Sequence, residues 1–274
     1  MQGALQRGKD VVEYSAFLLL EVMVMDRLLE NYNCVVTGGS RGIGKAIAKA
    51  FVMQGANVVI TYVSNNASAE QTVKELEQYG TKVFLFKSDA GNENDVRNLA
   101  EFVKEKLTYI NVLVNNAGTV GRECPTKDLP VEEWDKVINT DLRGVFLNTK
   151  YFIPLFDENS TGKIINISSE LSKKGRANYI HYTAAKGAVN SMTRSLALEL
   201  APHILVNTLA PGPIETDMIL KDMEAEWVEK EKQIPLKKLG TVEDISATAV
   251  LLASKYGEFY CGQFISPNGG AVFN

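Results

Sequence analysis

The sequence predicts an α/β fold in which one doubly wound parallel sheet is covered by helices on both faces. Short, continuously apolar runs rich in β-branched residues alternate with helix-length stretches from residue 33 onward, as expected for buried parallel strands. The connections between them are short, as in consecutive β–α units. With 274 residues, 45% of them hydrophobic, the chain can bury one large core, so we expect a single domain over residues 27–274.

The expected strands and helices follow one another in order along the chain. Strands are expected at 33–37, 57–62, 82–86, 110–115, 163–168, 204–210 and 262–266. Helices are expected at 43–54, 68–79, 93–107, 131–152, 182–200 and 242–254. Ligands of an open parallel sheet bind beyond the carboxyl ends of its strands, near the point where the strand order reverses. Functional residues are therefore expected directly after strands.

Composition narrows the classes of partner. The net charge is −4 and the Lys and Arg residues are spread along the chain, so we expect no nucleic acid and no membrane as partner. The three cysteines, Cys34, Cys124 and Cys261, are far apart and form neither a disulfide framework nor a metal-binding CxxC, which suits a cytoplasmic protein. Only His181 and His203 are available as imidazole ligands, so no metal site is expected.

Residues 1–26 are expected to be an N-terminal extension. Its apolar run at 17–25 is interrupted by Glu21 and is too short to span a bilayer. No small-residue cleavage site follows it, which argues against a signal peptide. An accessory helix and a non-native leader remain the alternatives.

A glycine-rich turn follows the first expected strand. Gly38, Gly42 and Gly44 have a G-x3-G-x-G spacing and open the next helix. Glycines permit positive φ and let backbone N–H groups approach a pyrophosphate, which the helix N-terminus attracts. A tight turn without a ligand is the alternative. The turn also resembles a Walker-A loop, but Ala46 replaces the hydroxyl residue that would bind Mg²⁺, which argues against an NTPase.

The end of the second strand bears on the choice of nicotinamide cofactor. An NAD site usually places an acidic residue there to bind the ribose 2′-OH. This chain has Tyr62, Ser64 and Asn65 instead. Without a carboxylate to repel it, a 2′-phosphate could be held by Arg41 together with Ser64 or Asn65. This pattern favours NADP(H), with NAD(H) as the alternative and a solvated turn residue as the other interpretation of Arg41.

Two tyrosines lie at or just before the start of the helix expected at 182–200. Tyr182 lies four residues before Lys186, so the phenol and the ammonium share one helix face, whereas Tyr179 has Thr183 at that spacing. The spacing alone fits an ordinary surface pair as well as a catalytic pair. The other motifs of the chain are needed to decide between them.

Together these motifs resemble the short-chain dehydrogenase/reductase family over residues 27–272. They occur in the order TGGSRGIG at 37–44, NNAG at 115–118, Asn139, NISS at 166–169, YTAAK at 182–186 and PGPIET at 211–216. The resemblance implies a Rossmann-type fold and hydride transfer between a nicotinamide and a carbonyl or secondary alcohol. The chain is most similar in appearance to 3-oxoacyl-acyl-carrier-protein reductases and to related sugar and carbonyl dehydrogenases.

The resemblance also implies the catalytic residues. Tyr182 matches the family's catalytic tyrosine, and it follows Ser169, rather than Ser168, by the family's usual interval of thirteen residues. Ser169 is then expected to hold the carbonyl oxygen. A matching Asn in the family holds a water that links the lysine to solvent, a role expected here of Asn139, with a buried structural Asn as the alternative.

The chemistry of carbonyl reduction is consistent with these roles. Hydride transfer creates alkoxide character on the oxygen, so a positioned acid must deliver a proton to it. A free tyrosine has a pKa near 10, and lowering it to about 7 requires roughly 4 kcal/mol of differential stabilisation. Lys186 and the positive charge of an oxidised nicotinamide are expected to supply that stabilisation.

The resemblance assigns the cofactor contacts to the ends of several strands. Asn116, Ala117 and Gly118 are expected on the adenine-ribose side, and the 211–216 loop is expected at the nicotinamide and pyrophosphate. Asp89 matches an adenine-contacting acid, with a helix N-cap as the alternative. The expected cofactor-binding residues are Gly38, Ser40, Arg41, Gly42, Ile43, Gly44, Tyr62, Ser64, Asp89, Ala90, Asn116, Ala117, Gly118, Tyr182, Lys186, Pro211, Gly212, Ile214 and Thr216.

The substrate is expected to be a small molecule or an acyl thioester. Reductases of carrier-bound substrates usually carry arginines near the positions of Pro154 and Leu198, and this chain offers only Arg194 there. A free carbonyl, sugar or steroid-like alcohol is therefore the rival substrate. A non-catalytic cofactor-binding protein would lack residues of the Ser, Tyr and Lys set, all of which are present. Met218, Met223 and Trp227 suggest an apolar substrate lid or, equally, a packed helix.

A homotetramer is expected, since most family members assemble in this way. The expected helices at 131–152 and 182–200 carry more apolar residues than one sheet-facing stripe requires, namely Phe146, Tyr151, Phe152, Met192 and Leu196. At the C-terminus, Val272 and Phe273 are apolar groups that another subunit is expected to cover.

Overall fold

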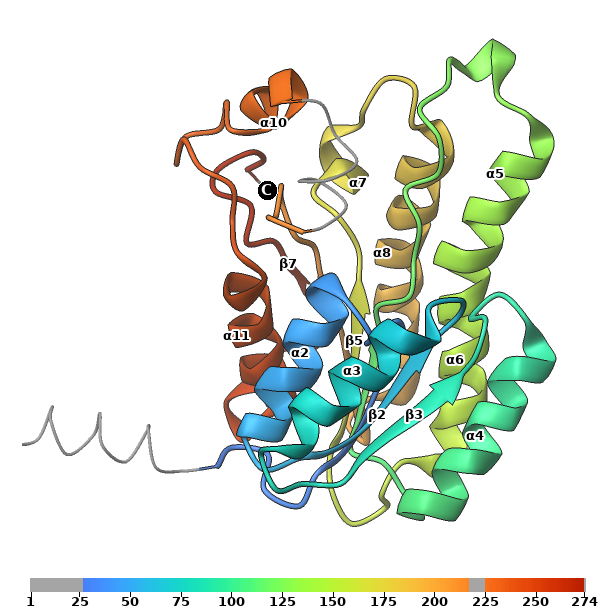
Figure 1. Ribbon diagram of the computed structural model, residues 1–274, viewed down its shortest axis with the longest axis vertical. Coiled ribbons are helices and arrows are strands. Elements are labelled where there is room, and N and C mark those ends of the chain that lie inside the picture. The colour runs from blue at the N-terminus through green and yellow to red at the C-terminus, as the bar shows by residue number, and fades with distance from the viewer. Residues whose placement is uncertain (1–26, 217–224, 274) are drawn as a thin grey trace, which may run out of the picture.

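One parallel sheet organises the protein, as seen in the computed structural model, which describes residues 27–216 and 225–273 (Figure 1). Seven strands lie in the order β3-β2-β1-β4-β5-β6-β7 and every neighbouring pair is parallel. They are β1 (Asn33–Val36), β2 (Asn57–Tyr62), β3 (Val83–Lys87), β4 (Val112–Asn115), β5 (Gly162–Ile167), β6 (Ile204–Leu209) and β7 (Phe264–Ile265). The strand order reverses between β1 and β4, so the expected doubly wound fold is confirmed.

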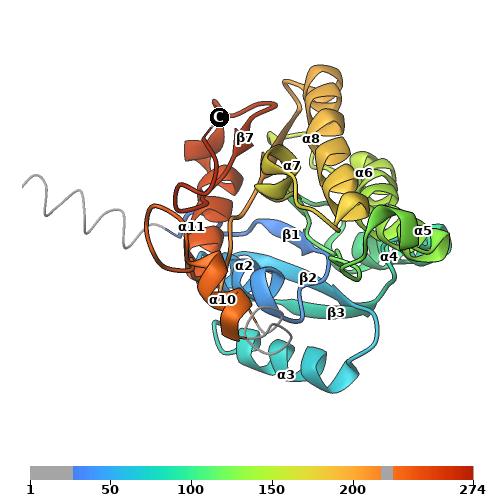
Figure 2. The ribbon, with the colours of Figure 1, turned by 90° about the horizontal axis from the view of Figure 1, so that it is seen from above.

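Helices cover both faces of this sheet (Figure 2). One face is covered by α2 (Gly42–Met53), α3 (Asn66–Glu77) and α11 (Val242–Ala253). The other face is covered by α4 (Glu93–Leu107), α5 (Val131–Ile138), η2 (Asn139–Arg143), α6 (Gly144–Phe152) and α8 (Ile180–Leu200). Shorter elements are η1 (Thr126–Asp128), η3 (Ile153–Leu155), α7 (Leu171–Lys174), α10 (Ala225–Glu231) and η4 (Lys255–Gly257).

The two faces of the sheet have separate apolar cores. Successive strand residues point to opposite faces, so Cys34 and Val36 of β1 join the core under α2 and α11, and Val35 joins the core under α4 and α6. All three side chains have no exposed surface. This burial on both faces explains why the strands appear in the sequence as continuous apolar runs.

The expected helix at 131–152 is the main departure in secondary structure. Its middle part, η2, is a π-helical turn that separates α5 from α6. Such single π turns within α-helices are frequently found at functional sites. In addition, α7 was not expected, whereas α10 lies where a packed helix was one of the two alternatives for Trp227. The strand β4 is shorter than the expected strand, with Ile110 forming an isolated bridge to Phe156.

Some expectations fall outside the described residues. The extension at 1–26, Met218, Met223 and the side chain of Trp227 are among them. Within the part of the chain that the structure describes, there is no helix with the length and apolarity needed to cross a membrane.

The apolar residues expected at subunit contacts differ in exposure. Phe146 is 49% exposed and Phe273 is 84% exposed, whereas Phe152 is fully buried in the core between α4 and α6. Of the apolar residues named on these helices, Phe152 therefore belongs to the core, and Phe146 is among those left exposed. Leu198 of α8 is also an exposed apolar side chain, with 89% of its surface accessible.

Candidate active site

The loops after β1, β4, β5 and β6 converge at the carboxyl edge of the sheet. Asn116 Nδ2, after β4, donates to the backbone oxygens of Thr37 (2.8 Å) and Gly38 (3.1 Å), after β1. The Glu170 N–H, after β5, donates to the oxygen of Pro211, after β6 (3.0 Å). Because the strands are parallel, motifs that are distant in the sequence meet at one edge, as expected.

The glycine turn has no room for a side chain where it meets the loop after β4. Gly38 has a φ of +63°, and a Cβ there would lie 3.0 Å from the Ala117 Cα. The Thr37 hydroxyl accepts from the Ala117 N–H at 3.0 Å and holds the two loops together. Thr37 was not among the expected site residues, because a threonine at the end of a strand carries no distinctive pattern.

The first turn of α2 fits an anionic ligand. Gly42 has a φ of +54°, and a Cβ there would meet, among the described residues, only Thr216 of the loop after β6, at 3.8 Å. Arg41 is the N-cap residue; its side chain makes no cap hydrogen bond, and the first helical turn contains no acidic residue. The helix N–H groups and the positive end of the helix dipole are thus available to a pyrophosphate.

The contacts after β2 distinguish Ser64 from Asn65, the two residues expected as alternatives for holding a 2′-phosphate. The Asn65 side chain accepts from the Ser68 N–H at 3.0 Å and caps α3. The Tyr62 hydroxyl donates to Asn66 Oδ1 at 2.6 Å. Ser64 is exposed. Ser64 is therefore the better placed of the two alternatives to accompany Arg41.

The loop after β3 is held by its own polar groups. Asp89 Oδ1 accepts from the Gly91 N–H at 2.9 Å. The N-cap of α4 is Asn92, so the alternative that Asp89 caps this helix is wrong. Ala90 is buried, and a Cβ at Gly144 would lie 3.0 Å from the Ala90 Cβ. These contacts fix α6 against the loop that carries Asp89.

The loop after β6 is anchored at two points. A Cβ at Gly212 would lie 2.6 Å from the Cα of Asn268, so no larger residue fits there. Ile214 is 4% exposed and forms an isolated bridge with Gly240. This anchoring presents Thr216 to the glycine turn across the site.

Ser169, Tyr182 and Lys186 come together at the ends of β5 and α8. The Lys186 Nζ lies 5.7 Å from the centroid of the Tyr182 ring and donates to the oxygen of Ile167 at 3.0 Å. Ser169 lies within hydrogen-bonding reach of the Tyr182 phenol. The Ser168 hydroxyl instead donates to the backbone oxygen of Lys186 at 3.0 Å, a structural contact. Ser169 is thus the serine that joins the phenol.

The side chain of Asn139 makes no hydrogen bond with Lys186 among the described residues, and its expected role in holding a water that links the lysine to solvent stays a prediction. Asn139 Oδ1 accepts from Arg143 at 3.1 Å, and its amide lies against Gly91. The Lys186 ammonium pairs instead with Asp141, whose Oδ2 lies 3.0 Å from Nζ.

The position of Asp141 explains this difference. Asp141 lies four residues from both Val137 and Val145, and all three are buried, whereas Asn139 lies off this stripe. The other Asp141 oxygen accepts from the Thr119 N–H at 2.8 Å. A carboxylate on an otherwise apolar stripe was the sequence signal that could have identified this residue.

A second unexpected carboxylate adjoins Ser169. Glu170 is 5% exposed, and its Oε2 accepts from the Ser169 hydroxyl at 2.9 Å. Burial raises the pKa of Glu170, and this effect outweighs the hydrogen bond from Ser169. Its position directly after the serine is the only sequence signal for this contact.

Burial and neighbouring charges act on the pKa values of both Tyr182 and Lys186. Burial raises the pKa of Tyr182, and Asp141 and Glu170 add to this effect, so the attraction of Lys186 and the hydrogen bond with Ser169 do not offset it. For Lys186, burial lowers the pKa, but its attraction to Asp141 and Tyr182 outweighs this and raises the pKa overall. In the protein alone, Lys186 does not bring the Tyr182 pKa below its usual value.

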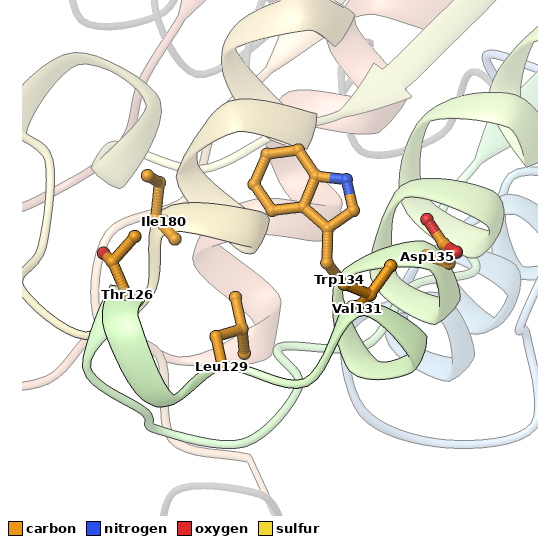
Figure 3. A pocket seen from close by; sticks show the side chains of 6 residues that line it. All are labelled: Thr126, Leu129, Val131, Trp134, Asp135 and Ile180. Atoms are coloured by element: carbon orange, nitrogen blue, oxygen red, sulfur yellow. The ribbon is translucent and has the colours of Figure 1, made fainter.

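A shallow pocket of about 380 Å³ lies beside this cluster (Figure 3). Trp134 of α5 and Ile180 of α8 line it, with Thr126, Leu129, Val131 and Asp135. Ile180 lies two residues before Tyr182, but no member of the Ser, Tyr and Lys set lines the pocket. The pocket therefore does not include the side chains expected to be catalytic.

Comparison with known proteins identifies the family. The family described as Enoyl-(Acyl carrier protein) reductase matches residues 38–272. The 3-oxoacyl-acyl-carrier-protein reductase FabG of Staphylococcus epidermidis is 35% identical over 244 residues, covering 88% of this chain and 98% of that protein. The chain belongs to the short-chain dehydrogenase/reductase family. It is therefore an oxidoreductase enzyme.

Other proteins are similar to a comparable degree. Glucose 1-dehydrogenase 2 of Bacillus subtilis is 33% identical, and the match covers 88% of this chain and 95% of that protein. The crystal structure of a blue fluorescent protein from a metagenomic library, in complex with NADPH, has a TM-score of 0.84 and 33% identity. It covers 89% of this chain and 100% of that one.

A short-chain dehydrogenase from Burkholderia cenocepacia, in complex with NADP, has a TM-score of 0.83 and 30% identity. That match covers 89% of this chain and 99% of the other.

Proposed function

We propose that this short-chain dehydrogenase/reductase reduces a carbonyl to a secondary alcohol with NADPH. The observation that carries the proposal is the convergence of Ser169, Tyr182 and Lys186 beside the anion-binding start of α2. The bound cofactor supplies the hydride. Tyr182 donates its phenol proton to the carbonyl oxygen, and Ser169 orients that oxygen by a hydrogen bond.

Three groups of residues form the proposed cofactor site. Gly38, Ser40, Gly42, Ile43 and Gly44 of the turn hold the pyrophosphate through backbone N–H groups. The loops after β3 and β4 contribute contacts on the adenine side. The loop after β6, with Thr216 near Gly42, closes the site at the nicotinamide.

The preference for NADP(H) rests on the charge at the end of β2. Arg41 and Ser64 are exposed, and no acidic residue stands at positions 62–65 to repel a 2′-phosphate. Two of the solved relatives are described as complexes with NADPH or NADP. NAD(H) is the alternative that a comparison of the two cofactors tests.

Two substrate classes remain in the proposal, each with an observation behind it. The similarity to FabG supports a 3-oxoacyl thioester. The surface at Pro154 and Leu198 supports a free carbonyl compound or a sugar as the substrate. Both residues are exposed, and neither carries the positive charge that would attract an acidic carrier protein. The similarity to glucose 1-dehydrogenase 2 is consistent with the second class.

A homotetramer completes the proposal. The exposed Phe146 on α6 and Leu198 on α8 are apolar groups that a two-fold partner would cover. Phe273 and Phe259, which is fully exposed before β7, would lie in a second contact at the C-terminal strand. Light scattering that returned a stable monomer mass at micromolar concentration would contradict this assembly.

The oxidation of NADPH, followed by absorbance, tests the catalytic proposal. The substrate panel contains acetoacetyl thioesters, small diketones and sugars, with NADH run in parallel. Turnover of a thioester alone assigns the first substrate class, and turnover of free carbonyls or sugars assigns the second. Binding of NADPH with no turnover across the panel would contradict the reductase proposal.

A further inference from the structure

Asp141 and Lys186 form a buried ion pair inside the catalytic cluster. The side chains are 0% and 5% exposed, and Asp141 Oδ2 lies 3.0 Å from Lys186 Nζ. The Thr119 N–H holds the second carboxylate oxygen at 2.8 Å, and the Ile167 oxygen accepts from Nζ at 3.0 Å. A Cβ at Gly118 would lie 2.8 Å from Asp141 Oδ2, so the glycine leaves room for the pair.

The pair changes the charge that the phenol experiences. A lone ammonium 5.7 Å from the Tyr182 ring would stabilise the phenolate strongly in a site that excludes water. With a carboxylate 3.0 Å from the same ammonium, the pair is neutral overall and its field at the phenol is largely cancelled. Lys186 can then orient ligands by hydrogen bonds without supplying a net positive charge.

The other charged groups near the phenol do not restore a positive environment. Glu170 approaches from the end of β5, and its charge opposes ionisation of Tyr182. His181, in the first turn of α8, interacts with Asp141, and burial lowers its pKa, so it remains a neutral ring. Within the described part of the chain, Lys186 is the only cation among the groups that influence the pKa of Tyr182.

We propose that Asp141 is a positioning residue that neutralises Lys186 and keeps Tyr182 protonated, so that the site favours carbonyl reduction over alcohol oxidation at neutral pH. This inference rests on the proposed function of Tyr182. In reduction, the carbonyl carbon takes the hydride, the oxygen takes the phenol proton, and Tyr182 is left as a phenolate that solvent reprotonates. Oxidation must begin from the phenolate, whose population Asp141 keeps low.

A tyrosinate titration by ultraviolet absorbance tests this role without any substrate. The protein is titrated with NADP⁺ present, and the Tyr182→Phe variant is subtracted to isolate the signal of Tyr182. In Asp141→Asn, measured against its own Tyr182→Phe double variant, the midpoint of Tyr182 is expected to fall by about 1–3 pH units. The amide oxygen of the substitute can still accept from the Thr119 N–H, so the loop retains its contact.

Two further variants make the result specific. Asp157→Asn is the matched control, because this carboxylate accepts from Asn159 and Ser160 in a turn before β5, at the opposite edge of the sheet. It is expected to leave the midpoint unchanged. Asp141→Ser removes the same charge with a smaller side chain and is expected to lower the midpoint if Asp141→Asn does not fold.

The failure of this inference differs from a failure of the proposed function. An unchanged midpoint in both Asp141 variants, with wild-type protein that reduces carbonyls, would overturn the role of Asp141 alone. A substrate panel that shows no turnover would overturn the reductase proposal, while the titration would still report the charge effect. With an active substrate, the pH profile of alcohol oxidation is expected to shift to lower pH in Asp141→Asn by the same amount as the titration.

Discussion

Protonation of His181 is expected to limit the stability of the protein at acid pH. The side chain is 0% exposed, and neither ring nitrogen has a hydrogen-bond partner among the described residues. Its ring is stacked near that of Tyr179, with the centroids 6.3 Å apart. Burial lowers the pKa of His181, although Glu133 and Asp141 act in the opposite direction. The folded protein therefore keeps this imidazole neutral.

The sign and size of the effect follow from proton linkage. A histidine in the unfolded chain has a pKa of about 6.5. Below that pH the unfolded state therefore binds a proton at this residue that the folded state does not bind. The free energy of unfolding therefore falls as the pH decreases from about 6.5 toward the pKa of the folded state. Each unit by which folding lowers the pKa removes about 1.4 kcal/mol at low pH.

Urea unfolding of His181→Leu, followed by circular dichroism between about pH 7.5 and pH 5, measures this term. Leu fills a similar volume and leaves no hydrogen bond broken, because the described structure gives the imidazole none. The variant is expected to gain stability over wild type by up to about 1.4 kcal/mol per pH unit below pH 6.5.

The exposed His203 provides the control for loss of a histidine, as His203→Gln. A difference between wild type and His181→Leu that stays constant across this pH range would refute the reasoning.

Three further outcomes are expected. Tyr182→Phe is expected to reduce kcat to less than about a tenth of wild type while NADPH binding, measured by fluorescence, stays nearly intact; higher residual turnover would contradict the role of the phenol as acid. Arg41→Ala is expected to raise the KM for NADPH far more than that for NADH, and equal increases would remove the argument for a bound 2′-phosphate. Deletion of residues 271–274 is expected to lower the mass seen by light scattering, because Phe273 would no longer contribute to the second contact.

The sequence alone determined the fold and the glycine turn that is expected to bind the cofactor. Strands buried on both faces must be continuously apolar, so each run of β-branched residues could be assigned from composition and length. The glycine turn was predictable for a similar reason, since positive φ at Gly38 and Gly42 strongly favours glycine. These are local constraints, and local constraints are visible in a single sequence.

Only the tertiary structure decided which side chains surround the phenol. Asp141 lies in the π-helical turn at Asn139–Arg143 and pairs with Lys186. Its spacing from Val137 and Val145 could have placed it on a buried stripe, but only the packed fold shows that Lys186 is its partner. Glu170 acts on Ser169 and Tyr182 because burial removes the water that would screen it. The spacing in the sequence identified Tyr182 and Lys186 as a pair, but the electrostatic environment of the two side chains depends on Asp141 and Glu170, which are distant in the chain. Electrostatic effects depend on distance and solvent exposure, and the packed fold sets both.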